Sequence, residues 1–185
     1  LGSIFSTFSI ELGQPNMFAW NSFEVRSLVD APNPGDANGG ALGADLQHRI
    51  HAVIRAAIDE GVIDARMQPT AASTEAGMAA VQLAVWEAVW ETSDSLSLTD
   101  GSSLVEGAGF NRVQALDDAL TGILDRANSY LTINRSDFSS FKVDGLAVLS
   151  SSNAQDQLAI VPLPRAAFAG LGLLGAAGVI RRFRK

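Results

Sequence analysis

Residues 75–91 have the sequence EAGMAAVQLAVWEAVWE, and the spacing of their side chains predicts a helix. Side chains four positions apart are neighbours on a helix surface, so a set that recurs at this interval lies on one face. Val81, Val85 and Val89 form one such set, and Gln82, Trp86 and Trp90 form a second. Aromatic residues at helical spacing most simply fill a core, although Trp86 and Trp90 could also shield a site at Gln82.

Two further helices are predicted, one before and one after this segment. The first runs from Asp45 to a stop at Gly61, and Asn111 can begin the other, with Gln114 reaching back in a capping box. Both segments have apolar residues at helical spacing. These are Leu46, Ile50, Val53, Ile54, Ala57 and Ile58 in the first, and Val113, Leu116, Leu120, Ile123, Leu124, Ala127 and Leu131 in the other.

Alternating patterns predict strands near both ends of the chain. Residues 3–12 and 18–29 alternate with the period of a strand, and residues 141–148 read as strand again. The apolar positions are Ile4, Phe8, Ile10 and Leu12, then Phe23, Val25 and Val29, and finally Phe141, Val143, Leu146 and Val148. Strands at both ends with helices between them predict an α+β fold, with an antiparallel sheet or sandwich from the N- and C-terminal strands and a three-helix insert.

The C-terminal residues combine a short proline motif, an apolar run and a basic end. The motif is Val161-Pro162-Leu163-Pro164, the apolar run is residues 166–180, and the cations are Arg181, Arg182, Arg184 and Lys185. The run is shorter than the about 20 residues that span a bilayer comfortably, but tilt or local thinning can accommodate it. We therefore expect a C-terminal transmembrane helix with its basic end in the cytoplasm as an anchor. The alternative is a buried core helix.

This order of features resembles the PEP-CTERM class of bacterial sorting signals, in its VPLPA variant, over roughly the last 25 residues. Arg165 stands where that variant usually has alanine. The resemblance implies recognition by a membrane protease of the exosortase type, which cuts near the motif. It also implies a location in the bacterial envelope, first as a membrane-anchored precursor and then at the cell surface or secreted. Extracellular polysaccharide or another surface ligand is the implied partner.

Length and composition predict one globular domain over residues 1–149, a linker over 150–160 and the sorting signal over 161–185. The net charge of −7 argues against nucleic acid as a partner. The chain has no cysteine, which excludes disulfides and thiolate metal sites. It lacks an initiator methionine and a signal-peptide pattern at its start, so we expect a mature or truncated sequence from which a signal peptide has been lost.

The segment from Gln82 through Ala84 to Trp86 resembles the Gln-x-Ala-Ile-Trp signature of thioester domains in bacterial surface proteins, with Val85 at the isoleucine position. In that family, an early strand supplies a cysteine, and Ser9 occupies the matching place here. The resemblance covers most of residues 3–149 in the order of elements. It implies an internal bond between the two side chains that an amine on another molecule can open.

Ser9 changes the chemistry that this resemblance implies. A hydroxyl is a poor nucleophile without a neighbouring base, and an oxoester is much less reactive toward amines than a thioester. We therefore expect a structural or adhesive domain that has lost its thioester, with the Gln82 amide satisfying main-chain groups of the N-terminal strand. The alternative is a covalent adhesin with a Ser9–Gln82 internal ester.

Other chemically capable residues give weaker patterns. Glu87 and Glu91 most simply form a solvated helix face. A secreted hydrolase that uses these two carboxylates, or the helix that carries His48 and His51, is the third hypothesis. Asp45, His48 and His51 recur at three-residue spacing but match no zinc signature, so we expect no metal and no other cofactor. The chain also lacks a nucleophile motif and a phosphate loop, and we do not expect an enzyme.

Overall fold

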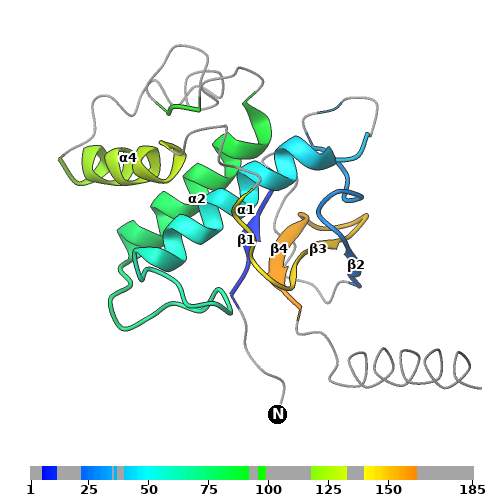
Figure 1. Cartoon of the computed structure of the whole chain (residues 1–185), viewed down its shortest axis with the longest axis horizontal. Helices are drawn as coiled ribbons and strands as arrows, with labels where there is room; N and C mark the ends of the chain where they lie inside the picture. Colours follow the sequence, from blue (N-terminus) through cyan, green and yellow to red (C-terminus); the bar gives the residue numbers. More distant parts are fainter. Residues whose placement is uncertain are drawn as a thin grey trace, which may run out of the picture.

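The structure is a computed structural model that describes residues 6–11, 22–34, 36, 40–91, 96–98, 118–132 and 140–161. These residues form an α+β fold with three helices and a four-stranded antiparallel sheet (Figure 1). In chain order, the elements are β1 (Phe8–Ser9), β2 (Glu24–Arg26), α1 (Gly43–Asp59), α2 (Glu75–Trp90), α4 (Asp118–Leu131), β3 (Leu146–Ser150) and β4 (Gln157–Ile160). The α+β class and the assembly of the sheet from both ends of the chain are confirmed.

The strand order is β1-β4-β3-β2, and each neighbouring pair is antiparallel. Leu158 of β4 lies opposite Phe8 on one side and Val148 on the other, and all three side chains are buried. Because side chains alternate between the two faces of a sheet, this row marks the face that packs on the core. The sheet therefore buries one continuous apolar row across β1, β4 and β3.

β4 lies where the sequence predicted a linker, and that prediction is wrong. Gln157–Ile160 pairs with both β1 and β3, so residues 150–160 belong to the sheet and its hairpin loop. The Ser- and Asn-rich composition is that of the loop, and the short apolar run in β4 shows no recognisable period. The domain extends to Val161, whose N–H donates to Gly145 O at 2.8 Å.

Gly145 makes this close end of the hairpin possible. Its φ is +76°, which disfavours residues with a Cβ, and a Cβ there would lie 2.9 Å from Val161 O. The first residue of the predicted sorting motif is thus attached directly to the end of the sheet.

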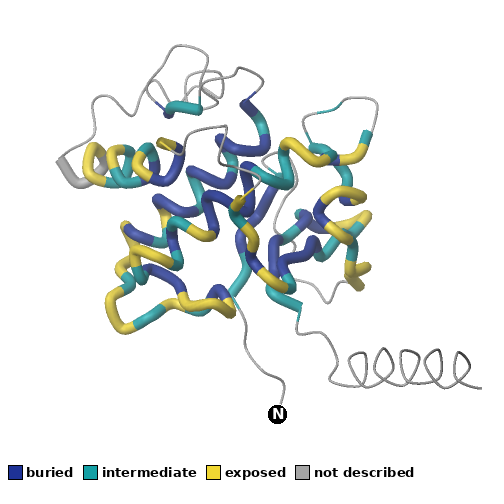
Figure 2. The backbone as a smooth tube through the Cα atoms, in the orientation of Figure 1, coloured by how far each residue is buried: buried dark blue, intermediate teal, exposed yellow. Residues whose placement is uncertain are grey.

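α2 lies between the other two helices and also contacts β1 (Figure 1). Its N-terminus is capped by Thr74 Oγ1, which accepts a hydrogen bond from Gly77 N at 3.0 Å. Neighbours on several sides explain why α2 is apolar on more than one face. The tube in Figure 2 is dark blue along much of this helix, whose buried residues are Gly77, Ala80, Val81, Ala84, Val85, Glu87, Ala88 and Val89.

α1 and α4 confirm those helix predictions that fall within the described residues. Ile50, Ile54 and Ala57 of α1 are buried, as are Ala127 and Leu131 of α4. The predicted cap Asn111, together with Gln114, Val113 and Leu116, lies outside the described residues.

Among the described residues of the second predicted strand, only Glu24–Arg26 form a strand, and the apolar side chains of this segment are exposed. The register places Arg26 opposite Val148, so Arg26 and Glu24 share the core side of the sheet and Val25 points the other way. β2 is an edge strand of the sheet, at the edge opposite to β1 (Figure 1). Phe23, Val25 and Val29 are consequently exposed.

The predicted C-terminal helix over 166–180 and the basic residues after it lie outside the described residues. Within the described ranges, no helix is both long enough and apolar enough to cross a membrane.

Candidate functional site

The structure brings Ser9 and Gln82 together at the junction of β1 and α2. Gln82 Oε1 accepts a hydrogen bond from Ser9 N at 3.0 Å, and Gln82 Nε2 donates one to Ser9 O at 2.7 Å. One carboxamide therefore satisfies both main-chain polar groups of a residue 73 positions away. This is the arrangement expected if Gln82 has a structural role.

The main chain of Ser9 faces α2 because of its place in the ladder. In an antiparallel pair, every second residue directs its N–H and C=O away from the partner strand. Ile10 N donates to Asp156 O of the chain leading into β4, and Ser9, one residue earlier, points outward. Outward main-chain groups on an edge strand need partners, and Gln82 supplies both of them.

The tryptophans of α2 extend this contact. Trp90 Nε1 donates to Ile10 O at 3.1 Å, so α2 makes three side-chain hydrogen bonds to the main chain of residues 9 and 10. Trp86 Nε1 is buried and makes no hydrogen bond in the structure, and Ala84 is fully buried. Gln82, Trp86 and Trp90 thus form the α2 face that packs along β1.

The Ser9 hydroxyl is bonded to the chain that follows it. Ser9 Oγ donates to Glu11 O at 2.9 Å and accepts from Glu11 N at 3.2 Å. Its hydrogen bonds are therefore local, whereas those of the Gln82 amide are with the Ser9 main chain. An ester between the two side chains would remove the Gln82 Nε2 that donates to Ser9 O and the hydroxyl proton that Ser9 Oγ donates to Glu11 O.

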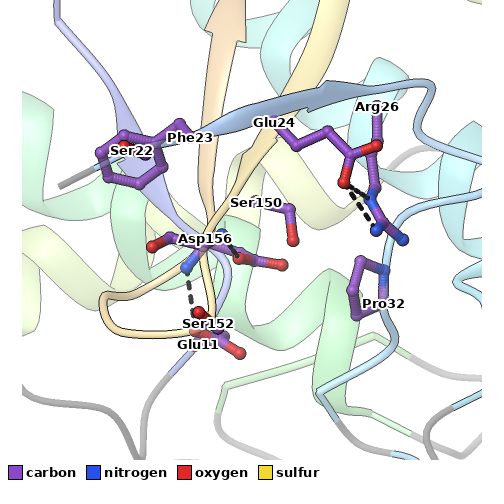
Figure 3. A pocket seen from close by; sticks show the side chains of 10 residues that line it. Glu11, Ser22, Phe23, Glu24, Arg26, Pro32, Ser150, Ser152 and Asp156 are labelled. Atoms are coloured by element: carbon purple, nitrogen blue, oxygen red, sulfur yellow. Dashed lines mark hydrogen bonds and ion pairs between the residues drawn. The ribbon is translucent and has the colours of Figure 1, made fainter.

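A pocket of about 570 Å³ adjoins the end of β1 (Figure 3). Three carboxylates, an arginine, several serines and an aromatic ring line it: Glu11, Ser22, Phe23, Glu24, Arg26, Pro32, Ser150, Ser151, Ser152 and Asp156. Its lining comes from segments far apart in the sequence, so no local motif could have indicated it.

Two carboxyl groups of this pocket, those of Glu11 and Asp156, have raised pKa values. Asp156 N donates to Glu11 Oε2 at 2.8 Å, and Ser151 N donates to Asp156 Oδ1 at 2.9 Å. Burial raises the pKa of the Glu11 carboxyl, against the lowering effect of the hydrogen bond from Asp156 N, and the charge of Asp156 adds to the rise. Burial also raises the pKa of Asp156, against the lowering effect of its hydrogen bonds from Ser151 and Ser150. Both groups therefore favour a proton or a hydrogen-bond donor more than ordinary carboxyls do.

Glu87 and Glu91 do not form a solvated face, so that prediction is wrong. Glu87 is fully buried and accepts a hydrogen bond from Ser97 N at 3.3 Å, and Glu91 is also buried. Arg49 of α1 is buried nearby in the same layer, and its Nη1 donates to Glu91 O at 2.9 Å. Four-residue spacing shows that the two glutamates share a helix face, but not whether that face is exposed. Here it is buried because other elements cover α2 on several sides.

The three candidate metal ligands on α1 have different surroundings. Asp45 is exposed, His48 is half-buried, and His51 is buried with its Nδ1 accepting a hydrogen bond from Val143 N at 3.1 Å. No group of three or more His, Asp or Glu side chains within the described ranges could hold a metal ion. His51 therefore links α1 to the start of the C-terminal hairpin.

The burial of His51 predicts a pH-dependent stability. Burial lowers the pKa of His51, and the neighbouring His48 and Lys142 lower it further, against the raising effect of Asp144. The unfolded chain then binds the proton more readily, so the contribution of His51 to stability is complete above about pH 6.5 and is lost as the pH falls toward the lower folded-state pKa. Urea unfolding should show that the free energy of unfolding falls between pH 7.5 and about pH 5. This fall should be smaller in His51→Gln and should be retained in His48→Gln. Equal pH profiles for the protein and His51→Gln would contradict this prediction.

Comparisons with protein-family models, with curated proteins and with solved structures each found no match.

Proposed function

We propose that the chain is an exported bacterial protein of the cell surface or extracellular matrix, whose folded domain is a structural or adhesive module without a thioester. The observation that carries the proposal for the domain is the double hydrogen bond between the Gln82 amide and the Ser9 main chain. The glutamine that would contribute the acyl group of a thioester joins α2 to β1 instead. A domain held in this way can support adhesion without covalent chemistry.

The proposal for sorting rests on the tail sequence and is compatible with where the sheet ends. The motif Val161 to Pro164 follows β4 immediately, and Val161 still bonds to Gly145. Cleavage by an exosortase-type protease after Val161 would therefore release the domain with its four strands complete. The basic residues Arg181, Arg182, Arg184 and Lys185 would hold the precursor at the cytoplasmic face of the membrane.

The proposed adhesive role has a suitable surface in the pocket beside Glu11 and Asp156 (Figure 3). Carboxylates accept hydrogen bonds, arginine donates them and serine does both. Such a lining suits a hydroxyl-rich surface ligand such as an extracellular polysaccharide.

One intact-mass measurement tests both parts of this proposal. The full chain, produced behind a secretion signal in bacteria that contain an exosortase-type protease, should be recovered from the cell exterior with its C-terminus at or near Val161–Pro164. Its mass should show no loss of ammonia, as in Gln82→Ala. The control with both Pro162 and Pro164 replaced by alanine should remain in the membrane at full length.

The outcomes separate the hypotheses. Release of the uncleaved chain, or equal processing of the proline variant, would overturn the sorting proposal. Loss of one ammonia that is absent in Gln82→Ala would replace the structural domain by the covalent adhesin with a Ser9–Gln82 ester. Ser9→Cys serves as a reference, because ammonia lost only in that variant would show geometry suited to a thioester. The hydrolase hypothesis is not favoured by any observation, since Glu87 and Glu91 are buried.

A further inference from the structure

The two edge strands of the sheet, β1 and β2, differ in what lies against their outward main-chain groups. At the β1 edge, the outward main-chain groups of Ser9 are bonded to Gln82. The other edge is β2, where Val25 is 55% exposed. An edge strand with outward main-chain groups can pair with another chain.

The ladder shows which residue of β2 faces outward. Val161 N donates to Gly145 O, so residues 145, 147 and 149 direct their main-chain groups toward β4, and 146, 148 and 150 direct theirs toward β2. Arg26 lies opposite Val148 and Glu24 opposite Ser150. Val25, between them, therefore directs its N–H and C=O away from the sheet.

We propose that β2 is the interface through which two copies of this chain associate, by antiparallel pairing about a two-fold axis at Val25. Val25 and the partner's Val25 then exchange two main-chain hydrogen bonds, and the two sheets become one continuous eight-stranded sheet. This inference does not depend on the proposed function.

The charges of β2 match a second copy in this register. Glu24 lies opposite the partner's Arg26, and Arg26 lies opposite the partner's Glu24. Within one chain, Arg26 Nη2 already lies 2.8 Å from Glu24 Oε2, so both side chains are on the same face of the sheet. Opposite charges directly across an antiparallel pair are stabilising. An edge strand whose charged side chains all had the same sign would instead repel a second copy.

The exposed apolar side chains gather at the same edge. Among the described residues, the large hydrophobic side chains that are exposed are Phe23 at 40%, Val25 at 55% and Val29 at 36%, all on or beside β2. Pairing would cover part of this surface. Because α2 closes the opposite edge of the sheet, each copy offers a single edge and the association stops at two chains.

A cysteine on the two-fold axis tests the register. The chain has no cysteine, and directly paired residues of this type lie about 5.5 Å apart between Cα atoms, within the range for a disulfide. Full-length Val25→Cys in a non-ionic detergent should form a disulfide-linked dimer under mild oxidation. Val29→Cys, which is also exposed but lies away from the axis, should remain monomeric at the same concentration. Equal cross-linking of the two variants, or none in either, would overturn the proposal.

A charge reversal tests the interface without a covalent bond. Glu24→Arg places arginine opposite the partner's Arg26 twice and should raise the dimer dissociation constant about tenfold. The double variant with Glu24→Arg and Arg26→Glu restores both cross-chain pairs and should return the constant to near that of the original chain. Density-matched sedimentation equilibrium of the full chain measures this constant. A monomer over the whole concentration range, or a dimer indifferent to Glu24→Arg, would overturn the proposal.

Discussion

Replacing Gln82 by alanine is expected to lower the free energy of unfolding by about 2 kcal/mol, because a buried main-chain group left without a partner costs about 1–3 kcal/mol. The substitution removes the acceptor of Ser9 N and the donor to Ser9 O together. Two main-chain groups lose their partner, and the expected value lies toward the low end of what two such losses would cost. The reason is that Gln82 is half-buried, so water can replace part of the lost hydrogen bonding. Urea unfolding followed by tryptophan fluorescence gives the difference.

Gln47→Ala is the matched control, because Gln47 is a half-buried glutamine on α1. It should change the free energy of unfolding by no more than about 0.5 kcal/mol. Gln82→Glu tests the two hydrogen bonds separately. A carboxylate can still accept from Ser9 N, but it has no N–H to donate to Ser9 O, so that second bond is lost. It should therefore be less stable than the original chain. A Gln82→Ala value as small as that of Gln47→Ala would show that α2 does not hold β1 through this amide.

The helices were predictable because their apolar spacing extends over several turns. The segment 75–91 was expected as a helix and α2 runs from Glu75 to Trp90, while α1 ends at Asp59, close to the expected stop at Gly61. The spacing could not show which other elements pack against each face of a helix. α2 is covered by two helices and by β1, so Glu87 is buried although it is charged. Helical period identifies a helix, but burial depends on which elements surround it.

The strands were predicted less well because pairing, rather than local pattern, decides their extent. Among the described residues of the first two expected strands, only those of β1 and β2 form strands, and β4 lies inside an expected linker. The alternation of Phe23 and Val25 resembled a buried face, yet the register with β3 directs Val25 to the surface. Short strands take their place from neighbours distant in sequence, which one sequence does not display.

The candidate site was predictable as a pair of positions and as a contact of the Gln82 amide with the main chain, but the residue that receives both bonds was not. The expected order of elements placed Ser9 on the first strand and Gln82 on the second helix, and the structure brings the two residues into contact. The expected role of the Gln82 amide, to satisfy main-chain groups of the N-terminal strand, is confirmed, but the sequence could not show that both groups belong to Ser9. That outcome follows from the outward direction of Ser9 in the ladder, which depends on the pairing with β4.

Replacing Glu87 by alanine should cost about 3 kcal/mol of unfolding free energy, as expected for a buried polar side chain whose partner is left unsatisfied and whose volume is left empty. Glu87 Oε1 accepts from Ser97 N, and Asn128 Oδ1 accepts from Leu98 N at 2.8 Å. Side chains from α2 and α4 thus hold residues 97 and 98 against the helices, and Leu98 is buried in the core. Loss of Glu87 removes one of these two attachments. Urea unfolding of the full chain is again the measurement.

Glu87→Gln and Glu75→Ala decide whether this loss has the proposed cause. Glu87→Gln keeps the volume and an acceptor for Ser97 N, so it should lose clearly less stability than Glu87→Ala. Glu75 lies exposed in the first turn of α2, where a carboxylate contributes at most about 1 kcal/mol through the helix dipole. If Glu87→Ala were no more harmful than Glu75→Ala, the side chain would not be fixing the segment after α2, and its burial would have to be stabilised from elsewhere. A large loss in both Glu87 variants would instead assign the stability to the charge of the carboxylate.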